Sequence, residues 1–332
     1  MSATKFEFQT EGRWSGGGNA FLDNARLAMR MRPDVFDSSE SAIPIIARNH
    51  PAERPRGPFI LAPQNAWPYG PPYTTGSVLA KWAGLKAATK YWTVRANAVI
   101  RISEAIPNAG RKVSPVIHNV LDEGFEQSLD ASLTLNSNRI LDETQGQIVS
   151  IGSINGYRNF GRLIAGFEHY RRSGGTRELH LIGNGSKALI TKLMSQADQV
   201  GGVRIHVGAF DRAECLAINR GAHAVVLPSL VEASPFTVLE ALAVSANVLV
   251  SEIPGNVGIV KNHGEFDVRA KFDPQHSTSI GDALLRSDEG ELSGVLNSVV
   301  SLRESRISDR AWWVDQIASW LQTLDFQTDG TG

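Results

Sequence analysis

Two glutamates, Glu232 and Glu240, flank the expected start of a helix and have seven residues between them. An apolar, β-branched run ends shortly before them at Leu227, and Ser234 followed by Pro235 has the pattern of an N-cap with proline at the first helical position. In an open parallel sheet, the loop after a strand lies at the carboxyl edge, where such folds bind ligands. The sequence therefore predicts that Glu232 lies in a ligand-binding crevice.

The expected helix adds its positive dipole end to the two carboxylates. The exposed amide groups of Phe236 and Thr237 would face the same crevice. Glu240, five residues past Pro235, would lie roughly 7.5 Å from it along the helix axis. This arrangement suits a ligand with a phosphate in its middle and hydroxyl groups at both ends, such as a sugar nucleotide. The spacing by itself is equally compatible with an ordinary capped helix that carries two surface glutamates.

The elements that must position this segment follow a repeating pattern over residues 145–308. Short β-branched runs alternate with stretches of helical periodicity, and after the first run Phe160, Leu163 and Phe167 recur at the spacing of one helix face. Alternating strands and helices predict a parallel, doubly wound sheet that is covered on both faces. The five runs are Ile148–Ile154, Leu179–Ile182, Val203–Val207, Ala224–Leu227 and Asn247–Ser251.

Residues 1–144 carry a weaker pattern of the same kind, and the polar stretch 136–147 suits a hinge between two α/β domains. A Pro- and aromatic-rich loop is expected at 67–73. The last helix, at about 309–324, carries three tryptophans that are interpreted as packing residues. Further expected elements are strands within 5–12, 57–63 and 97–103 and helices at 20–31 and 75–93.

Composition excludes several classes of protein. The 332 residues have a formal net charge of −1, which argues against a dedicated nucleic-acid binder. The single cysteine, Cys215, excludes an internal disulfide and a multi-thiolate metal site. No apolar run reaches the roughly 18 residues of a membrane span, and the first residues lack the apolar core of a signal peptide. These absences lead us to expect a cytoplasmic protein. We also expect no bound metal, since no histidine pair or D-x-D triplet has a metal-binding spacing.

Glu232 and Glu240 resemble the E-x7-E motif of the group 1 (family 4) retaining glycosyltransferases, and several further blocks of that family match in order. The resemblance implies the GT-B fold, in which two Rossmann-like doubly wound domains face a cleft, here with a reduced N-terminal domain. It implies an acceptor-side domain at 1–144, a nucleotide-sugar-binding domain at 145–308 and a helix at 309–326 that crosses back to the first domain. The further blocks are 180–185, 203–208, 225–231, 239–251 and 272–274.

The resemblance also implies roles for individual residues. Glu232 would approach the transferred sugar, and Glu240 would hold the ribose hydroxyls of the nucleotide. Arg158 takes the position of the family's lysine on the diphosphate, and as an arginine it can pair with phosphate through two hydrogen bonds. The other donor-binding candidates are Ser153, Ser234, Phe236, Thr237, Gly17, Gly18, Gly183 and Gly208.

Besides Ala233 and Pro235, which replace the usual glycines after Glu232, the sequence departs from the family pattern at three positions that bear on activity. Ser153 stands where the family has an arginine, and Gly258 stands where it tends to have a glutamate. Gln64 takes the place of a histidine found in many members after a central strand, and an amide cannot take up a proton near neutral pH. Gln64, Asn65 and Trp67 are the candidates on the acceptor side.

The function expected from this resemblance is retaining transfer of a sugar from a nucleotide-diphosphate donor to a glycan or lipid-linked acceptor, without a cofactor. The three departures motivate a different class, a non-catalytic subunit that binds a sugar nucleotide. A sugar-nucleotide epimerase on the same fold is the nearest enzymatic alternative. An epimerase would need no acceptor, and a binding subunit would release no nucleoside diphosphate.

Basic residues are concentrated in residues 51–115, which contain nine lysines and arginines against two glutamates, although the whole chain carries −1. Lys81, Lys86 and Lys90 fall on the expected helix with two tryptophans, Trp82 and Trp92. Basic residues among interfacial aromatics suit an anionic membrane surface or an anionic acceptor, which would add a peripheral position at the inner face of the membrane. A solvated basic face, balanced by the acidic remainder of the chain, is the alternative.

Overall fold

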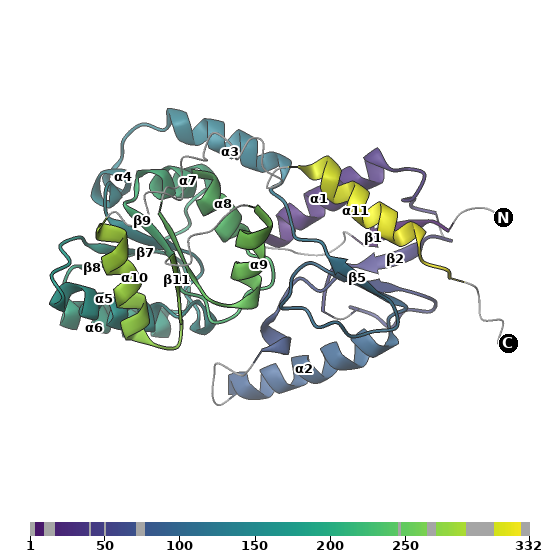
Figure 1. Ribbon diagram of the computed structural model, residues 1–332, viewed down its shortest axis with the longest axis horizontal. Helices are drawn as coiled ribbons and strands as arrows, with labels where there is room; N and C mark the ends of the chain where they lie inside the picture. The colour runs from purple at the N-terminus through teal and green to yellow at the C-terminus, as the bar shows by residue number, and fades with distance from the viewer. Residues whose placement is uncertain are drawn as a thin grey trace. The chain divides into compact units, whose positions relative to one another are not determined.

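The computed structural model describes residues 4–9, 17–39, 41–49, 51–70, 77–244, 247–263, 270–289 and 309–326. These residues form two compact units, each built around a parallel sheet (Figure 1). The first unit comprises the described residues up to Asp122 together with 309–326, and the second begins at Glu123. Among the described residues, no helix is long and apolar enough to cross a membrane.

The first unit contains strands in consecutive order, β1-β2-β3-β4-β5, with all neighbours parallel. The order of the strands therefore does not reverse within the described part of this sheet. Its elements are β1 (Phe6–Gln9), α1 (Gly17–Met31), β2 (Ile43–Ile46), β3 (Ile60–Leu61), η1 (Trp67–Tyr69), α2 (Ser77–Arg95), β4 (Ala98–Arg101), β5 (Val113–Val116) and α11 (Arg310–Gln322).

The two faces of this sheet bury different helices. Phe8 of β1 stacks on Trp313 of α11 and meets Phe21 of α1 edge-on, so the final helix packs within the first unit. On the opposite side of the strands, Trp92 of α2 packs against a cluster that includes Leu61. The alternation of side chains along a strand explains this division, because neighbouring residues point to opposite faces.

The second unit contains a sheet in the order β11-β10-β9-β6-β7-β8. The chain starts at the central strand β6, builds outward through β7 and β8, and then returns to the other side of β6 to form β9. Its elements are α3 (Glu123–Thr134), α4 (Arg139–Thr144), β6 (Ile148–Ile151), η2 (Gly156–Arg158), α5 (Phe160–Arg172), β7 (Leu179–Gly183), α6 (Lys187–Val200), β8 (Val203–Val207), α7 (Arg212–Gly221), β9 (Ala224–Leu227), α8 (Phe236–Val244), β10 (Val248–Ser251), α9 (Pro254–His263), β11 (Lys271–Phe272) and α10 (Ser277–Asp288).

The reversal of strand order between β6 and β9 is a topological switch point, at which open α/β sheets form ligand-binding crevices. The helix face predicted from Phe160, Leu163 and Phe167 is buried as expected, in the core beneath α5. All five predicted strands of this region are present, and the additional strand β11 pairs with β10.

The boundary between the units differs from the expected hinge at 136–147. It falls at Asp122, because α3 and α4 pack on α7 of the second unit. Part of the polar stretch forms α4, whose first turn is capped by the side chain of Asn138. The polarity of the stretch thus reflects a capped surface helix.

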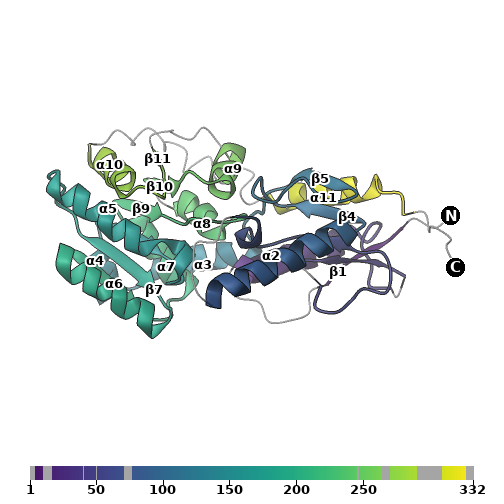
Figure 2. The same ribbon diagram turned by 90° about the horizontal axis from the view of Figure 1, so that it is seen from below.

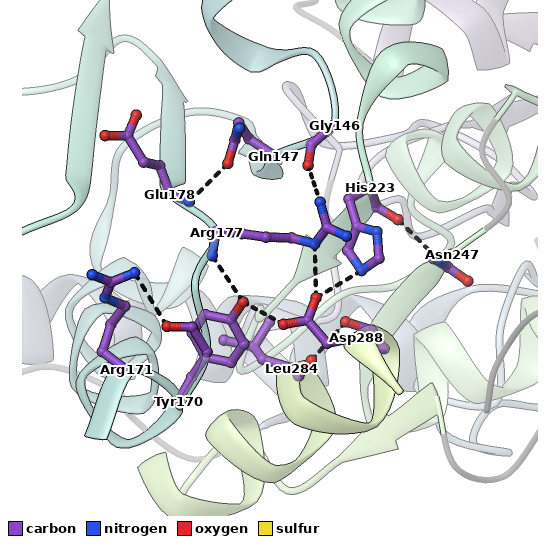
Figure 3. Close-up of polar contacts among 12 residues, drawn as sticks. Gly146, Gln147, Tyr170, Arg171, Arg177, Glu178, His223, Asn247, Leu284 and Asp288 are labelled. Atoms are coloured by element: carbon purple, nitrogen blue, oxygen red, sulfur yellow. Dashed lines mark hydrogen bonds and ion pairs between the residues drawn. The ribbon is translucent and has the colours of Figure 1, made fainter. Parts of the chain in front are cut away.

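A charged cluster closes the amino edge of the second sheet (Figure 3). Asp288, at the end of α10, accepts a hydrogen bond from Arg177 Nε at 2.7 Å and one from the Tyr170 hydroxyl, and it lies 3.0 Å from His223 Nε2. Arg177 also donates to the Gly146 carbonyl at 2.6 Å. Burial, together with the hydrogen bond to Asp288, raises the pKa of Tyr170 to about 12, so its hydroxyl remains a donor.

Candidate active site

The loops that follow β6 and β9 are joined at the switch point. Leu230 N donates to the Tyr157 carbonyl at 2.8 Å. The buried side chain of Asn159 donates to the carbonyls of Pro228, at 3.1 Å, and Pro274, at 2.8 Å. Asn159 has a φ of 62°, in the left-handed region that asparagine tolerates better than most residues. Asn159 therefore holds the β6 loop, which carries Arg158, against the β9 loop.

Arg158 and Glu232 form an ion pair across the two loops. Arg158 NH1 lies 2.9 Å from Glu232 Oε1, and both side chains are largely buried, with 15% and 13% of their surfaces exposed. Burial, the largest single influence, would lower the pKa of Arg158, but the Glu232 carboxylate and Tyr157 together outweigh it and raise that pKa. The guanidinium thus stays charged at the carboxyl edge of the sheet.

One donor of Arg158 is left over. Its Nε is buried and has no hydrogen-bond partner, although an unsatisfied buried donor costs about 1–3 kcal/mol. Gly152 lies beside the guanidinium, since a Cβ added at Gly152 would be 3.6 Å from the Arg158 Cζ and Nε atoms. An anion that accepts from Nε would remove this cost.

A network behind the β9 loop fixes Glu232. The Ser229 hydroxyl donates to Glu232 Oε1 at 2.9 Å, and Ser251 Oγ donates to the Ser229 carbonyl at 2.6 Å. Asn256 in turn donates to Ser251 Oγ at 2.9 Å. Gly255 lies directly against this loop, because an added Cβ would be 2.2 Å from the Glu232 carbonyl oxygen. The carboxylate is therefore positioned by packed neighbours at the end of β10.

Helix α8 begins at Phe236, one residue later than the sequence pattern indicated. The first amide groups of a helix have no partner within it, and the nearby Thr237 Oγ1 is buried without a hydrogen-bond partner. Ser234 is buried just before the helix. The start of α8 therefore carries a buried hydroxyl, Thr237 Oγ1, that has no hydrogen-bond partner.

Glu240 lies in α8 and pairs with a residue that the sequence reasoning missed. Arg212 Nε donates to Glu240 Oε1 at 2.7 Å, and the Arg212 guanidinium lies 5.4 Å from the centre of the Phe125 ring. Arg212 begins α7 directly after the capping residue Asp211. That capping box, at the carboxyl edge of β8, was the sequence signal that could have identified Arg212.

The remaining donor-side candidates in this unit lie at the same carboxyl edge. Ser153 is exposed after β6. Gly183 has a φ of 154°, and an added Cβ would lie 2.0 Å from the Gly152 carbonyl oxygen, so this glycine is required for close backbone approach. Gly208 N donates to the Gly183 carbonyl at 3.2 Å. The structure thus gives Gly183 a packing reason that is independent of any ligand.

The candidates in the first unit are engaged within that unit. Gly17 and Gly18 are the first two residues of α1. Gln64 follows the central strand β3 and donates to the Ala62 carbonyl at 3.0 Å. Asn65 Oδ1 accepts from Trp67 N at 2.8 Å, which shapes the turn into η1.

The structure brings together Arg158 and Glu232, with Ser229 and Asn159 as partners that the sequence did not single out. Glu240 forms a separate pair with Arg212. The described residues hold no group of three or more histidine, cysteine, aspartate or glutamate side chains arranged to bind a metal ion.

The architecture is that of an α/β protein of the GT-B fold, with the buried Arg158–Glu232 pair at the switch point of the second sheet. Comparison identifies the family of that unit: residues 135–286 match the group 1 glycosyl transferases. The resemblance seen in the sequence is confirmed over these residues, and the protein is a glycosyltransferase.

Solved structures share the fold at low sequence identity. The α,α-trehalose-phosphate synthase (UDP-forming) from Burkholderia vietnamiensis is 11% identical with a TM-score of 0.63, and the match covers 94% of this chain and 81% of that one. A Burkholderia xenovorans synthase in complex with glucose-6-phosphate is 11% identical with a TM-score of 0.62, over 93% and 79%. An E. coli structure bound with UDP-2-fluoro glucose is 12% identical with a TM-score of 0.60, over 94% and 80%. No curated protein sequence matches this chain.

Proposed function

We propose that the second unit binds a nucleotide-diphosphate sugar at the switch point between β6 and β9, and that the protein transfers the sugar with retention of its anomeric configuration. The observation that carries this proposal is the buried Arg158 guanidinium, which contacts Glu232 in the β9 loop and whose Nε lacks a partner. A diphosphate is an acceptor with the charge and the geometry to satisfy such a group.

In this reaction the bond between the anomeric carbon and the phosphate oxygen breaks, and its electron pair leaves with the nucleoside diphosphate. A new bond forms from the acceptor hydroxyl oxygen on the same face of the sugar, and the hydroxyl proton passes to a phosphate oxygen or to solvent. Arg158 and the donors at the start of α8 would stabilise the charge that develops on the leaving group. These groups are fixed in place before the reaction begins.

Glu232 would face the positive charge that develops on the sugar ring. Its carboxylate is held by Ser229 and Arg158 in the absence of donor. If a diphosphate paired with Arg158, the ion pair between Arg158 and Glu232 would weaken, and the Glu232 carboxylate would be more available to the sugar. Glu240 would hold the ribose hydroxyls, with Arg212 as the residue that positions it.

The reaction proposed here requires no metal, because Arg158 and the helix supply the positive charge. The donor is unidentified, and the UDP-sugar seen with the E. coli neighbour makes UDP-glucose the first donor to test. Glucose 6-phosphate is the corresponding first acceptor, since it is bound in a B. xenovorans neighbour. A soluble glycan and a lipid-linked sugar are the two broader acceptor classes.

The test measures release of nucleoside diphosphate from UDP-, GDP- and ADP-glucose, with and without an acceptor and with and without EDTA. A transferase releases it only when the acceptor is present, and NMR of the product should show the donor's anomeric configuration. Release without an acceptor would favour an epimerase-type reaction. Tight donor binding without any release would favour a non-catalytic binding subunit.

A further inference from the structure

Helix α2 buries only a narrow strip of its surface. Thr89 and Thr93 are its buried residues among those described, and Trp92 is half-buried against the ring of Phe59. In Figure 2, α2 runs in front of the strands of its unit, and no other element of that unit is drawn over it. Most of this 19-residue helix therefore faces solvent.

The solvent side of α2 carries an apolar stripe. Its members recur three or four residues apart and thus share one helix face. All are exposed, including Tyr91 at 47% and Val94 at 58%. Surface helices usually place polar residues on their outer face, so this stripe is unusual for a helix that remains in water. The stripe consists of Ala80, Ala83, Ala87, Tyr91 and Val94.

Basic residues flank the stripe on both sides, and α2 contains no acidic residue. Lys86 and Lys90 lie on one side, and Lys81 and Arg95 lie on the other. The Lys86 ammonium lies 4.6 Å from the centre of the Trp82 ring. The Arg95 guanidinium lies 3.7 Å from that of Tyr91.

We propose that the outer face of α2 lies on an anionic lipid bilayer, with the apolar stripe at the boundary between headgroups and acyl chains and the four basic residues among the headgroups. An apolar face bordered by lysine and arginine is the pattern of helices that lie in a membrane interface. Charge complementarity selects anionic over neutral lipid. The proposal concerns the first unit and does not depend on the donor site at the switch point.

The consequence is a protein held at a membrane surface through its first unit. Such docking would favour acceptors carried in the same membrane, which narrows the proposed function toward a lipid-linked acceptor. The exposure of the stripe is the new observation: the sequence placed basic and aromatic residues on this helix, but it did not indicate that the helix is apolar on two opposite faces.

The experiment is co-sedimentation of the full chain with vesicles of phosphatidylcholine, or of phosphatidylcholine with phosphatidylglycerol, at low and high salt. The expected result is binding to the phosphatidylglycerol vesicles at low salt, little binding to neutral vesicles, and loss of most binding in about 0.5 M salt, where charges are screened within a few Å.

Two pairs of variants separate the contributions of charge and apolar contact. K86Q/K90Q should weaken binding to anionic vesicles about tenfold or more, because each basic residue near such a surface contributes measurably. R54Q/R56Q removes two exposed charges from the β2–β3 loop of the same unit and should leave binding nearly unchanged. Val94→Asn should weaken binding severalfold, whereas Leu133→Asn, at a 62% exposed position on α3, should not.

Absence of binding to anionic vesicles at low salt would overturn the proposal. Equal losses in K86Q/K90Q and R54Q/R56Q would also overturn it, because they would indicate attraction by overall charge. Self-association that Val94→Asn abolishes, without vesicle binding, would assign the stripe to a second copy of this chain. Melting temperatures of all variants establish that they are folded, and failure of sugar transfer would leave this result unaffected.

Discussion

The sheet of the second unit carries an arginine–carboxylate pair at each of its two edges, and the pairs differ in how fully their donors are used. At the amino edge, Arg177 Nε binds Asp288 and its NH1 binds a carbonyl, while Tyr170 binds the second oxygen of the carboxylate (Figure 3). At the carboxyl edge, Arg158 contacts Glu232 but its buried Nε has no partner.

This difference distinguishes a structural pair from the proposed binding site. A donor that already has its hydrogen bond gains little from a ligand, whereas an unsatisfied buried donor gains a hydrogen bond when an anion arrives. The topology agrees, because only the carboxyl edge at the strand reversal forms a crevice in open α/β sheets. An ion pair therefore points to a ligand site when it retains an unsatisfied buried donor and lies at the carboxyl edge of the sheet.

The largest expected effect is on turnover at the carboxyl edge. Glu232→Gln should lower the transfer rate by about 10²–10³-fold, the range found when one preorganised electrostatic group is removed. Its melting temperature should also fall, because Arg158 loses its buried ionic partner, although the glutamine can still accept from Ser229; the rate is therefore compared per folded molecule. Steady-state kinetics and thermal unfolding measure both quantities; an unchanged rate would remove Glu232 from the site.

Asn159, which joins the β6 and β9 loops, should contribute to the stability of the fold. Asn159→Ala should lower the free energy of unfolding by about 3 kcal/mol, because it loses two buried hydrogen bonds and places alanine at a left-handed φ. Asn159→Gly tolerates that φ and should cost about 1 kcal/mol less. Chemical denaturation measures the difference, and equal losses would show that backbone conformation does not contribute.

The amino-edge pair should differ from Glu232 in its effect on turnover. Asp288→Asn should lower the free energy of unfolding by about 2 kcal/mol, because Arg177 loses its ionic partner in a half-buried position. The transfer rate per folded molecule should remain within about twofold. A loss of turnover comparable to that of Glu232→Gln would contradict the distinction between the edges.

A smaller effect is expected on the pH dependence of stability. Burial, together with the stacked neighbour His206, lowers the pKa of His180 to about 4, so the unfolded chain binds this proton more readily than the folded one. The stabilisation is complete above the ordinary histidine pKa of about 6.5 and decreases as the pH falls toward 4, by about 1–2 kcal/mol at pH 5. Denaturation at pH 7 and pH 5 should show this loss, and His180→Asn should reduce it; a loss of equal size in that variant would assign the effect to other groups.

The fold of the second unit could be predicted from the sequence because each strand and helix there has its own apolar periodicity. Short strands such as β2 and β5 were not predicted, since four residues without clear alternation give little hydrophobic periodicity. The hinge expected at 136–147 was misplaced because polarity does not distinguish a linker from a capped surface helix.

The site was predicted only in part, for a related reason. The family resemblance indicated Arg158, Glu232 and Glu240 as candidates, but a resemblance in sequence does not specify partners that come from distant segments. Arg212 and Asn159 act through contacts with residues 28 and up to 115 positions away, which only the folded chain reveals. The need for glycine at Gly183 likewise arises from the neighbouring Gly152 carbonyl.

The most direct test of the central claim is calorimetric binding of UDP, GDP and ADP, each compared with its nucleoside, to the parent protein, Arg158→Ala and Arg204→Ala. Arg204 is an exposed residue of β8 that pairs with Glu178 and serves as the matched control. For the nucleotide that binds, Arg158→Ala should weaken binding of the diphosphate by about 10–100-fold, which corresponds to one or two charge-assisted hydrogen bonds. Binding of the nucleoside to this variant, and binding of both ligands to Arg204→Ala, should be nearly unchanged. Equal losses for diphosphate and nucleoside would contradict the assignment of Arg158 to the diphosphate.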